Sequence, residues 1–417
     1  MKRIVIEGNK KLKGEIPISG AKNSALALVP ASILAKDKVT IENVPNISDI
    51  DALTEILNNL GAKVNLNGKV LKIDTSGVDK LVISEEISKK LRASYYFMGA
   101  LLGRYKKVEM YFPGGCSIGA RPIDLHLKGF EALGAKVKEK GNKYILEAKK
   151  LKGAQIYLDF PSVGATINIM FAAVMAEGET VIENAAKEPE ISNVATFLNN
   201  MGANISGAGT GEIKIQGVKE LKGCTTEVIP DRIEAGTYII LSAMAGKDVY
   251  VRDLIPSHID SLLTKLSELG YKVNYNLSLA YIEKTRVKRP VIVRTQVYPG
   301  FPTDLQQPIT PLLMMSEGTS ELEETIYENR FQHVPYLNDM GGKIRIKGQS
   351  LKIKGPTKFK GTTVRATDLR AGACLVLAAL FADGTTIIED AHHVLRGYEN
   401  IVEKLQNIGA DIKIEEV

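Results

Sequence analysis

Tryptophan is absent from this 417-residue chain, and all aromatic residues together make up only 6% of it. Proteins that bind single-stranded nucleic acid stack the bases on aromatic side chains, so this scarcity argues against a nucleic-acid-binding protein. Basic residues outnumber acidic ones by only six (54 against 48), an excess that does not by itself indicate nucleic acid. A small anionic substrate fits this charge balance equally well.

Cysteine and histidine are also scarce, with three and five residues. The three cysteines, Cys116, Cys224 and Cys374, are odd in number and far apart, and no CxxC pair occurs. We therefore expect neither a disulfide framework nor a structural zinc site, and we expect no metal or other cofactor.

Long hydrophobic runs are missing as well. No run of 18 or more apolar residues occurs, so we expect no transmembrane helix and no membrane partner. The apolar stretch near the N-terminus, residues 4–6, is too short for a secretory signal, which leads us to expect a cytoplasmic protein. Apolar residues make up 44% and charged residues 24%, close to the globular average, and the length suggests two or three domains.

One pattern recurs six times along the chain: an apolar residue, a glycine, two variable residues and a β-branched residue. The interval is about 70 residues, longer than the roughly 20–50 residues of solenoid repeats, so we expect compact lobes rather than a rod. A single copy would be an ordinary helix-turn-strand sequence, but six near-even copies indicate six related units. The glycines are Gly61, Gly134, Gly202, Gly270, Gly341 and Gly409.

Each glycine follows an amphipathic helical stretch, such as residues 51–60 or 399–408, and precedes a strand-like stretch. A glycine there is the expected helix C-cap, because it adopts the left-handed conformation at little cost. A second strand recurs upstream, for example at residues 179–183 and 385–389. The chain is thus predicted to be of the α/β class, built of α+β repeats. Helices at residues 164–176 and 369–381 are apolar nearly all round and should be buried.

The most unusual stretch is residues 113–125, where three glycines surround Cys116. Pro122 suits the first turn of a helix, so Cys116 should lie just before a helix N-terminus and near Arg121. Both features favour a thiolate and hence a reactive thiol. A free cysteine is more often a small buried residue, and we interpret Cys224 and Cys374 in that way.

Two further stretches place small residues at the start of an apolar helix: residues 161–166, and residues 20–25 with Lys22. Backbone N–H groups there can hold a phosphate, although Ser, Thr and Gly are also ordinary capping residues. Each of four arginines could form an internal salt bridge, but as a set with Lys22 and Arg121 they suggest a strongly anionic ligand. These arginines are Arg92, Arg330, Arg370 and Arg396.

Nine segments together resemble those of the UDP-N-acetylglucosamine 1-carboxyvinyltransferases, the enolpyruvyl transferases that commit the sugar nucleotide to peptidoglycan. The resemblance runs essentially end to end, and the ordered set is highly specific. The segments are residues 20–26, 91–94, 113–125, 162–166, 230–236, 301–304, 328–331, 366–371 and 396–399.

The resemblance implies two domains, each an inside-out α/β barrel of three repeated units, six in total. One domain would span residues 22–229, and the other would combine residues 1–21 with 230–417. The implied reaction transfers the enolpyruvyl group of phosphoenolpyruvate to the 3′-hydroxyl of UDP-N-acetylglucosamine and releases phosphate. The implied partners are these two small molecules, and the sequence indicates no particular protein partner.

The resemblance also implies roles for individual residues. Cys116 would protonate the methylene carbon of phosphoenolpyruvate and is the residue that the epoxide fosfomycin alkylates in this family. Asp304, which alone would be taken for a helix cap, would accept either the hydroxyl proton or the proton lost on elimination. Lys22, Arg121 and Arg396 would bind phosphoenolpyruvate, with Arg370 in support. The remaining substrate contacts would be Asn23, Arg92, Pro122, Ile123, Asp124, Leu125, Ser162, Val163, Gly164, Ile326 and Arg330.

Three other interpretations stay open at this stage. The sister enolpyruvyl transferase that acts on shikimate 3-phosphate shares the six-unit build but uses no loop cysteine as its acid. RNA 3′-phosphate cyclase has related repeats but needs a histidine that carries the nucleotide. A non-catalytic paralogue that only binds a nucleotide sugar would not require both Cys116 and Asp304.

Overall fold

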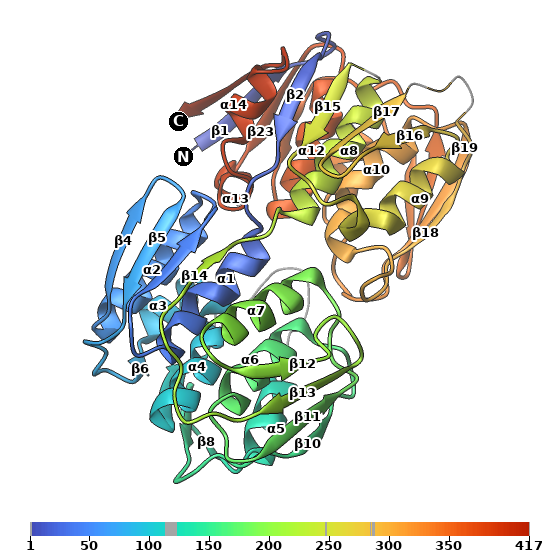
Figure 1. Cartoon of the computed structure of the whole chain (residues 1–417). Helices are drawn as coiled ribbons and strands as arrows, with labels where there is room; N and C mark the ends of the chain where they lie inside the picture. The colour runs from blue at the N-terminus through green and yellow to red at the C-terminus, as the bar shows by residue number, and fades with distance from the viewer. Residues whose placement is uncertain (1, 113–122, 247, 284, 286–287, 417) are drawn as a thin grey trace. The chain divides into compact units, whose positions relative to one another are not determined.

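The computed structural model describes residues 2–112, 123–246, 248–283, 285 and 288–416. These residues form two compact units (Figure 1). One unit combines the N-terminal segment up to Ser19 with the chain from Pro230 onward, and the other holds the described residues from Gly20 to Ile229. No helix of the described part is long and apolar enough to cross a membrane.

The unit from Gly20 to Ile229 contains three four-stranded sheets. In each sheet, the first pair of strands is parallel and the others are antiparallel. The sheets are β14 (Thr225–Glu227), β3 (Val39–Glu42), β5 (Val70–Asp74), β4 (Lys63–Asn67); β6 (Val82–Ile83), β7 (Lys107–Tyr111), β9 (Lys143–Glu147), β8 (Lys136–Lys140); and β10 (Gln155–Tyr157), β11 (Glu179–Glu183), β13 (Glu212–Gln216), β12 (Asn204–Ser206).

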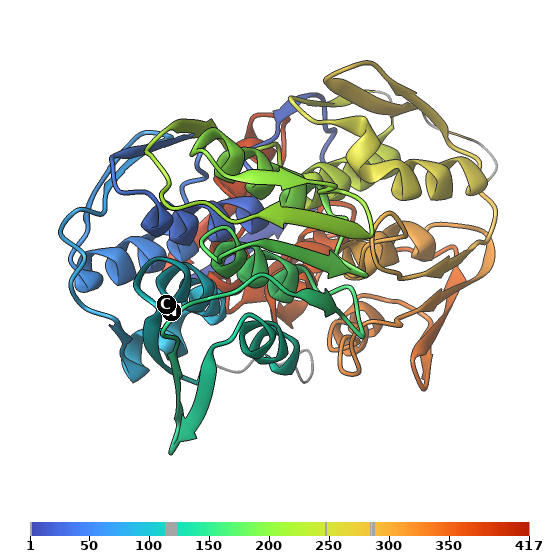
Figure 2. The same ribbon diagram turned by 60° about the horizontal axis from the view of Figure 1, so that its bottom comes forward.

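Three helices of this unit are buried on nearly all sides. They are α1 (Lys22–Ala31), α4 (Tyr96–Tyr105) and α6 (Val163–Ala173), and α4 packs on both of the others. The others are α2 (Ser48–Leu60), α3 (Glu85–Lys90), α5 (Asp124–Ala132) and α7 (Pro189–Asn200), with 3₁₀ turns η1 (Ser32–Leu34) and η2 (Arg92–Tyr95). Figure 2 shows the green strands of the β10–β13 sheet running side by side.

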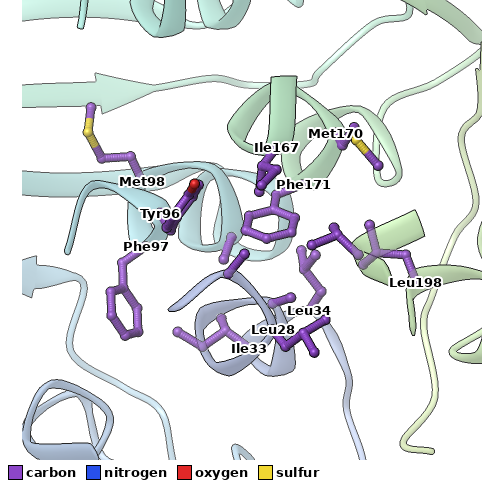
Figure 3. Close-up of a cluster of buried hydrophobic side chains, with 14 of the residues drawn as sticks. Leu28, Ile33, Leu34, Tyr96, Phe97, Met98, Ile167, Met170, Phe171 and Leu198 are labelled. Atoms are coloured by element: carbon purple, nitrogen blue, oxygen red, sulfur yellow. The ribbon is translucent and has the colours of Figure 1, made fainter. Parts of the chain in front are cut away.

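The core of this unit is made where these helices meet (Figure 3). Leu28 of α1, Phe97 of α4 and Phe171 of α6 are fully buried. Because α1, α4 and α6 present apolar residues on all sides, they lie inside, and the sheets lie around them with alternating buried and exposed residues.

The other unit repeats this plan with three further four-stranded sheets. The N-terminal strands β1 and β2 complete two of them, which is why the unit is built from both ends of the chain. The sheets are β22 (Thr363–Arg365), β23 (Thr385–Glu389), β1 (Lys2–Glu7), β24 (Asp411–Glu416); β16 (Lys272–Tyr275), β17 (Leu279–Glu283), β15 (Val249–Arg252), β2 (Gly14–Pro17); and β18 (Ile292–Arg294), β19 (Gly318–Glu323), β21 (Ser350–Gly355), β20 (Ile344–Lys347).

Its buried central helices are α8 (Arg232–Ala245), α10 (Gln306–Met314) and α12 (Leu369–Leu380). The remaining elements are α9 (Asp260–Glu268), α11 (Val334–Asp339), α13 (His392–Leu395) and α14 (Ile401–Gln406), with 3₁₀ turns η3 (Pro256–Ile259) and η4 (Thr303–Leu305). Six sheets over two units thus match the six repeats predicted from the sequence.

All six repeat glycines adopt positive φ angles, between 93° and 105°, as predicted for helix C-caps: Gly61, Gly134, Gly202, Gly270, Gly341 and Gly409. The predicted strands at 179–183 and 385–389 are β11 and β23 to the residue. The helices predicted at 164–176 and 369–381 are α6 and α12, which end slightly earlier.

Other helix boundaries differ from the prediction. The helical stretch predicted at residues 51–60 begins three residues earlier, at Ser48, as α2. The apolar helix expected at residues 20–25 begins at Lys22 as α1, because the Ala25 N–H already donates to the Ala21 carbonyl at 2.9 Å. The helix expected over residues 399–408 is shortened to α14. Asn400 has a left-handed conformation (φ 50°), which does not occur within a right-handed helix, so the helix can only begin after it.

Candidate active site

Asp304 lies between two buried arginines in the 3₁₀ turn η4, just before α10. Its Oδ1 accepts a hydrogen bond from Arg330 Nη2 at 2.7 Å, and its Oδ2 accepts one from Arg370 Nη2 at 3.1 Å. The arginine side chains are only 3% and 6% exposed, whereas that of Asp304 is 26% exposed. The structure therefore brings together three residues that the sequence suggested separately, with the carboxylate toward solvent.

Both arginines remain charged in this cluster. Burial alone would lower the pKa of Arg330, but the Asp304 carboxylate outweighs it and the pKa is raised. Burial alone would also lower the pKa of Arg370. Tyr398 and Asp304 outweigh this effect and raise the pKa well above its usual range. The Asp304 carboxylate faces two guanidinium groups, and the buried carboxylates of Glu324 and Asp231 also act on these cations.

The tyrosines beside these guanidinium groups restrict their movement. The Arg330 guanidinium carbon lies 5.1 Å from the Tyr327 ring centre, and that of Arg370 lies 5.4 Å from the Tyr398 ring centre. Such contacts favour a planar cation over the ring face. The Arg330 guanidinium group is thereby oriented to donate two hydrogen bonds, one to Asp304 and one to the hydroxyl of Thr303, each at 2.7 Å.

Two other predicted residues belong to the same unit. The Ile326 N–H donates to the carboxylate of Glu324 at 2.9 Å, which fixes the turn after β19. Arg396 is exposed at the C-terminal end of α13, where its N–H donates to the His392 carbonyl at 3.1 Å. An exposed guanidinium there can still meet an anion from solvent.

Lys22 is the first residue of α1 and is paired with an acid. Its Nζ lies 2.6 Å from Asp49 Oδ2, and the two side chains are 7% and 9% exposed. Asp49 lies in the first turn of α2. The pairing holds the ammonium group at the N-terminus of a buried helix, where helix-end N–H groups also favour an anion. The neighbouring Asn23 is half-buried.

The start of α6 forms a second predicted binding segment. Ser162 is its N-cap, accepting from the Ala165 N–H at 3.3 Å, and Val163 is half-buried behind it. A Cβ at Gly164 would lie 3.0 Å from both the Tyr95 hydroxyl oxygen and His126 Cε1. Glycine therefore lets these two side chains approach the helix start closely.

His126 joins this segment to the next one. It lies on α5 and directly follows Ile123, Asp124 and Leu125, of which Ile123 is buried and Asp124 exposed. Burial, helped by the charge of Arg92, lowers the pKa of His126 to about 3, so the ring is neutral. Its Nδ1 lies 2.9 Å from Asn168 Nδ2 of α6. The structure thus gathers Arg92, the start of α5 and the start of α6.

Cys116, Arg121 and Pro122 lie outside the described residues. Cys374 is fully buried in α12 and Cys224 is half-buried, in keeping with structural roles. Within the described part of the chain, no group of three or more His, Cys, Asp or Glu residues could hold a metal ion.

Sequence reasoning missed Glu324, Thr303, Asp49 and His126. Glu324 directly follows strand β19, and Thr303 begins the turn η4 before α10. Aligning the six repeats at these element ends could have drawn attention to both residues. Asp49 and His126 had no signal of their own, because an acid in a first helical turn and one helical histidine are ordinary features.

A family model described as EPSP synthase (3-phosphoshikimate 1-carboxyvinyltransferase) matches residues 6–405. The chain is 52% identical to UDP-N-acetylglucosamine 1-carboxyvinyltransferase 2 of Listeria innocua, over 98% of this chain and 97% of that protein. It is also 52% identical to the proteins of the same name from Bacillus subtilis (99% and 96% covered) and Staphylococcus aureus (99% of each).

The chain belongs to the UDP-N-acetylglucosamine 1-carboxyvinyltransferase family. The resemblance stated from the sequence is thereby confirmed, and the chain is a transferase of the enolpyruvyl type. Among solved structures, the enolpyruvyl transferase NikO from Streptomyces tendae matches with a TM-score of 0.90 and 27% identity, over 100% of this chain and 99% of that one.

EPSP synthase from Acinetobacter baumannii matches with a TM-score of 0.76 over the full length of both chains, at 18% identity, and so shares the fold. This family's fold is the inside-out barrel, and the fold class predicted from the sequence is confirmed. Each unit of this family member has that build, with central helices and surrounding sheets.

Proposed function

We propose that this chain transfers the enolpyruvyl group of phosphoenolpyruvate to the 3′-hydroxyl of UDP-N-acetylglucosamine and releases phosphate, the first committed step of peptidoglycan synthesis. The observation that carries the proposal is the 52% identity, over nearly the whole chain, to relatives that bear this name. The much lower identity to an EPSP synthase, 18%, favours the sugar nucleotide over shikimate 3-phosphate. We place the reaction in the cytoplasm.

The chemistry requires an acid and a base on the two reactants. A proton is added to the methylene carbon of phosphoenolpyruvate, and the sugar oxygen bonds to the adjacent carbon while its hydroxyl proton leaves. A proton is then lost from the new methyl group, and the bond to phosphate breaks. We assign the first proton to Cys116 and its removal in the second step to the same thiolate.

Asp304 takes the hydroxyl proton in this proposal. Its partial exposure and its fixed orientation by Arg330 and Arg370 support the assignment. The same guanidinium groups offset negative charge that builds up in the tetrahedral adduct. Because both oxygens already accept hydrogen bonds, the incoming proton uses a remaining lone pair of the carboxylate.

Binding is assigned to the other predicted residues, with domains at residues 22–229 and at 1–21 with 230–417. Lys22, Arg121, Arg396 and Arg370 take phosphoenolpyruvate. The sugar nucleotide is assigned to Asn23, Arg92, Pro122, Ile123, Asp124, Leu125, Ser162, Val163, Gly164, Ile326 and Arg330. The N-termini of α5 and α6, which lie near His126, suit a diphosphate, because backbone N–H groups at the start of a helix can bind an anion.

The test is the rate of phosphate release from phosphoenolpyruvate with each acceptor in turn. UDP-N-acetylglucosamine should support turnover and shikimate 3-phosphate should not. Turnover only with shikimate 3-phosphate, or with neither acceptor, would reject the proposal.

A further inference from the structure

Glu324 is a buried acid directly after strand β19, with 1% of its surface exposed. Its Oε1 accepts hydrogen bonds from the Ile326 N–H at 2.9 Å, the Tyr327 N–H at 3.2 Å and the Thr295 hydroxyl at 3.0 Å. Its Oε2 accepts one from the Thr303 hydroxyl at 2.8 Å. A buried carboxylate costs free energy unless it is bonded in this way, and here both oxygens are occupied.

Thr303 extends this network to the proposed base. Its oxygen accepts a hydrogen bond from Arg330 Nη1 at 2.7 Å, and Nη2 of the same guanidinium bonds Asp304. A continuous series of hydrogen bonds therefore runs from Glu324 through Thr303 and Arg330 to Asp304. A separate branch runs from Glu324 to the backbone of Ile326.

The position of Glu324 is unusual among the six repeats. In four repeats, the residue after the corresponding strand is Asn43, Asn184, Asp253 or Asp390, each with φ between 53° and 63°. A short polar side chain tolerates this left-handed turn. Within the described residues, the two repeats that depart are those with Phe112, before the Cys116 segment, and with Glu324, in the repeat that carries Asp304.

We propose that Glu324 is a positioning residue that fixes Asp304 and Arg330 through Thr303 and fixes the Ile326 segment directly. This inference rests on the proposed function, because it assigns Asp304 to proton transfer and Ile326 to the sugar nucleotide. The side chain of aspartate or asparagine is shorter than that of glutamate by one methylene group, so from the same backbone it could not reach Thr303. Small errors in the placement of a base cost much of the rate, so the network matters for turnover.

The two branches predict different kinetic results. Thr303→Val removes only the hydroxyl between Glu324 and Arg330, so kcat should fall at least tenfold. Because Arg330 is also assigned to the sugar nucleotide, KM for UDP-N-acetylglucosamine should rise too, but less than in Glu324→Gln, which also disturbs the Ile326 segment. Glu324→Gln should lower kcat similarly and also raise KM for the sugar nucleotide severalfold. Thr303→Ser keeps the hydroxyl and should restore most of the rate.

Glu323→Gln is the matched control. The Glu323 side chain lies on the opposite, exposed face of the same strand end and pairs with Arg294 at 2.7 Å. The Glu323→Gln substitution should leave kcat and KM for UDP-N-acetylglucosamine unchanged. Circular dichroism and thermal unfolding of each variant show whether it folds, and if Glu324→Gln does not fold, the two Thr303 variants decide.

A Thr303→Val variant with the kcat of an active wild type would overturn the inference while leaving the proposed function intact. Equal losses in Thr303→Val and Thr303→Ser would also overturn it, because the hydroxyl would then be irrelevant. A wild type that releases no phosphate with UDP-N-acetylglucosamine would instead contradict the proposed function itself.

Discussion

The carboxylate of Asp304 and the guanidinium of Arg330 lie 2.7 Å apart, although 26 residues separate them along the chain. Charge-assisted bonds of this length are among the stronger ones in proteins, and this one is largely shielded from water by the burial of Arg330. Asp304 is therefore oriented before any substrate arrives.

From that orientation we expect Asp304→Ala to bind UDP-N-acetylglucosamine with an affinity within a few fold of wild type, yet to lose turnover by at least a hundredfold. The proton acceptor is gone, while the contacts assigned to the sugar nucleotide lie on other residues. Calorimetry and phosphate release measure the two effects separately. If binding were lost together with turnover, the role of Asp304 would be to position the substrate.

The buried pair of Lys22 and Asp49 predicts a loss of both stability and substrate binding. Lys22→Met leaves the buried Asp49 carboxylate without this cation, which should lower the free energy of unfolding by about 3 kcal/mol. KM for phosphoenolpyruvate should rise at least tenfold. Lys36→Met, which breaks the exposed pair with Glu220, is the control and should change neither quantity measurably. Equal effects of the two substitutions in urea titrations would contradict a special role for Lys22.

We expect fosfomycin to alkylate only one of the three cysteine thiols. Burial raises the pKa of Cys374 well above its usual range, and burial also raises that of Cys224, so both stay protonated and slow to react at neutral pH. One equivalent of fosfomycin should therefore add at Cys116 alone, and Cys116→Ser should abolish both the adduct and most of the turnover. Intact mass and peptide mapping test this. An adduct on Cys224 or none at all would contradict a reactive Cys116.

Acid should destabilise the protein through two buried histidines. Burial, with Arg92, lowers the pKa of His126 to about 3; burial lowers that of His333 to about 4, with Asp368 opposing it and Arg330 adding to it. Unfolded histidine takes up a proton below about pH 6.5, and the folded rings do not. Each histidine thus contributes stability above pH 6.5 that is lost as the pH falls, about 2 kcal/mol each between pH 7 and 4.5.

Urea unfolding at these two pH values checks the expected loss. His126→Gln and His333→Gln should each make the stability less dependent on pH over this range. An unchanged pH dependence in both variants would show that these rings are not the groups that titrate.

The sequence predicted the fold well because the repeat is marked by residues with one clear physical role. A glycine such as Gly202 (φ 105°) ends a helix, and apolar stretches such as α6 can only be buried. The helix starts were harder to predict: α1 begins at Lys22, where a charged residue interrupts the apolar pattern but still pairs within the core.

For the site, the sequence indicated individual residues but not how the fold brings them together. Nothing local in the sequence says that Arg370 meets Asp304, since the two are 66 positions apart in the chain and the fold alone joins them. Glu324 was missed because it ends an acidic, alternating strand and looks like a solvated residue there. Alignment of the six repeats at the residue after the strand would have shown that Glu324 and Phe112 depart from the Asn or Asp of the other four.

The most direct test of the account follows the product rather than the rate. The enzyme is incubated with phosphoenolpyruvate and UDP-N-acetylglucosamine and followed by ³¹P NMR and mass spectrometry. We expect free phosphate to appear together with one enolpyruvyl ether of the sugar nucleotide, its diphosphate intact. Phosphate without a modified sugar nucleotide, or an enolpyruvyl group found only on shikimate 3-phosphate when both acceptors are present, would contradict the account.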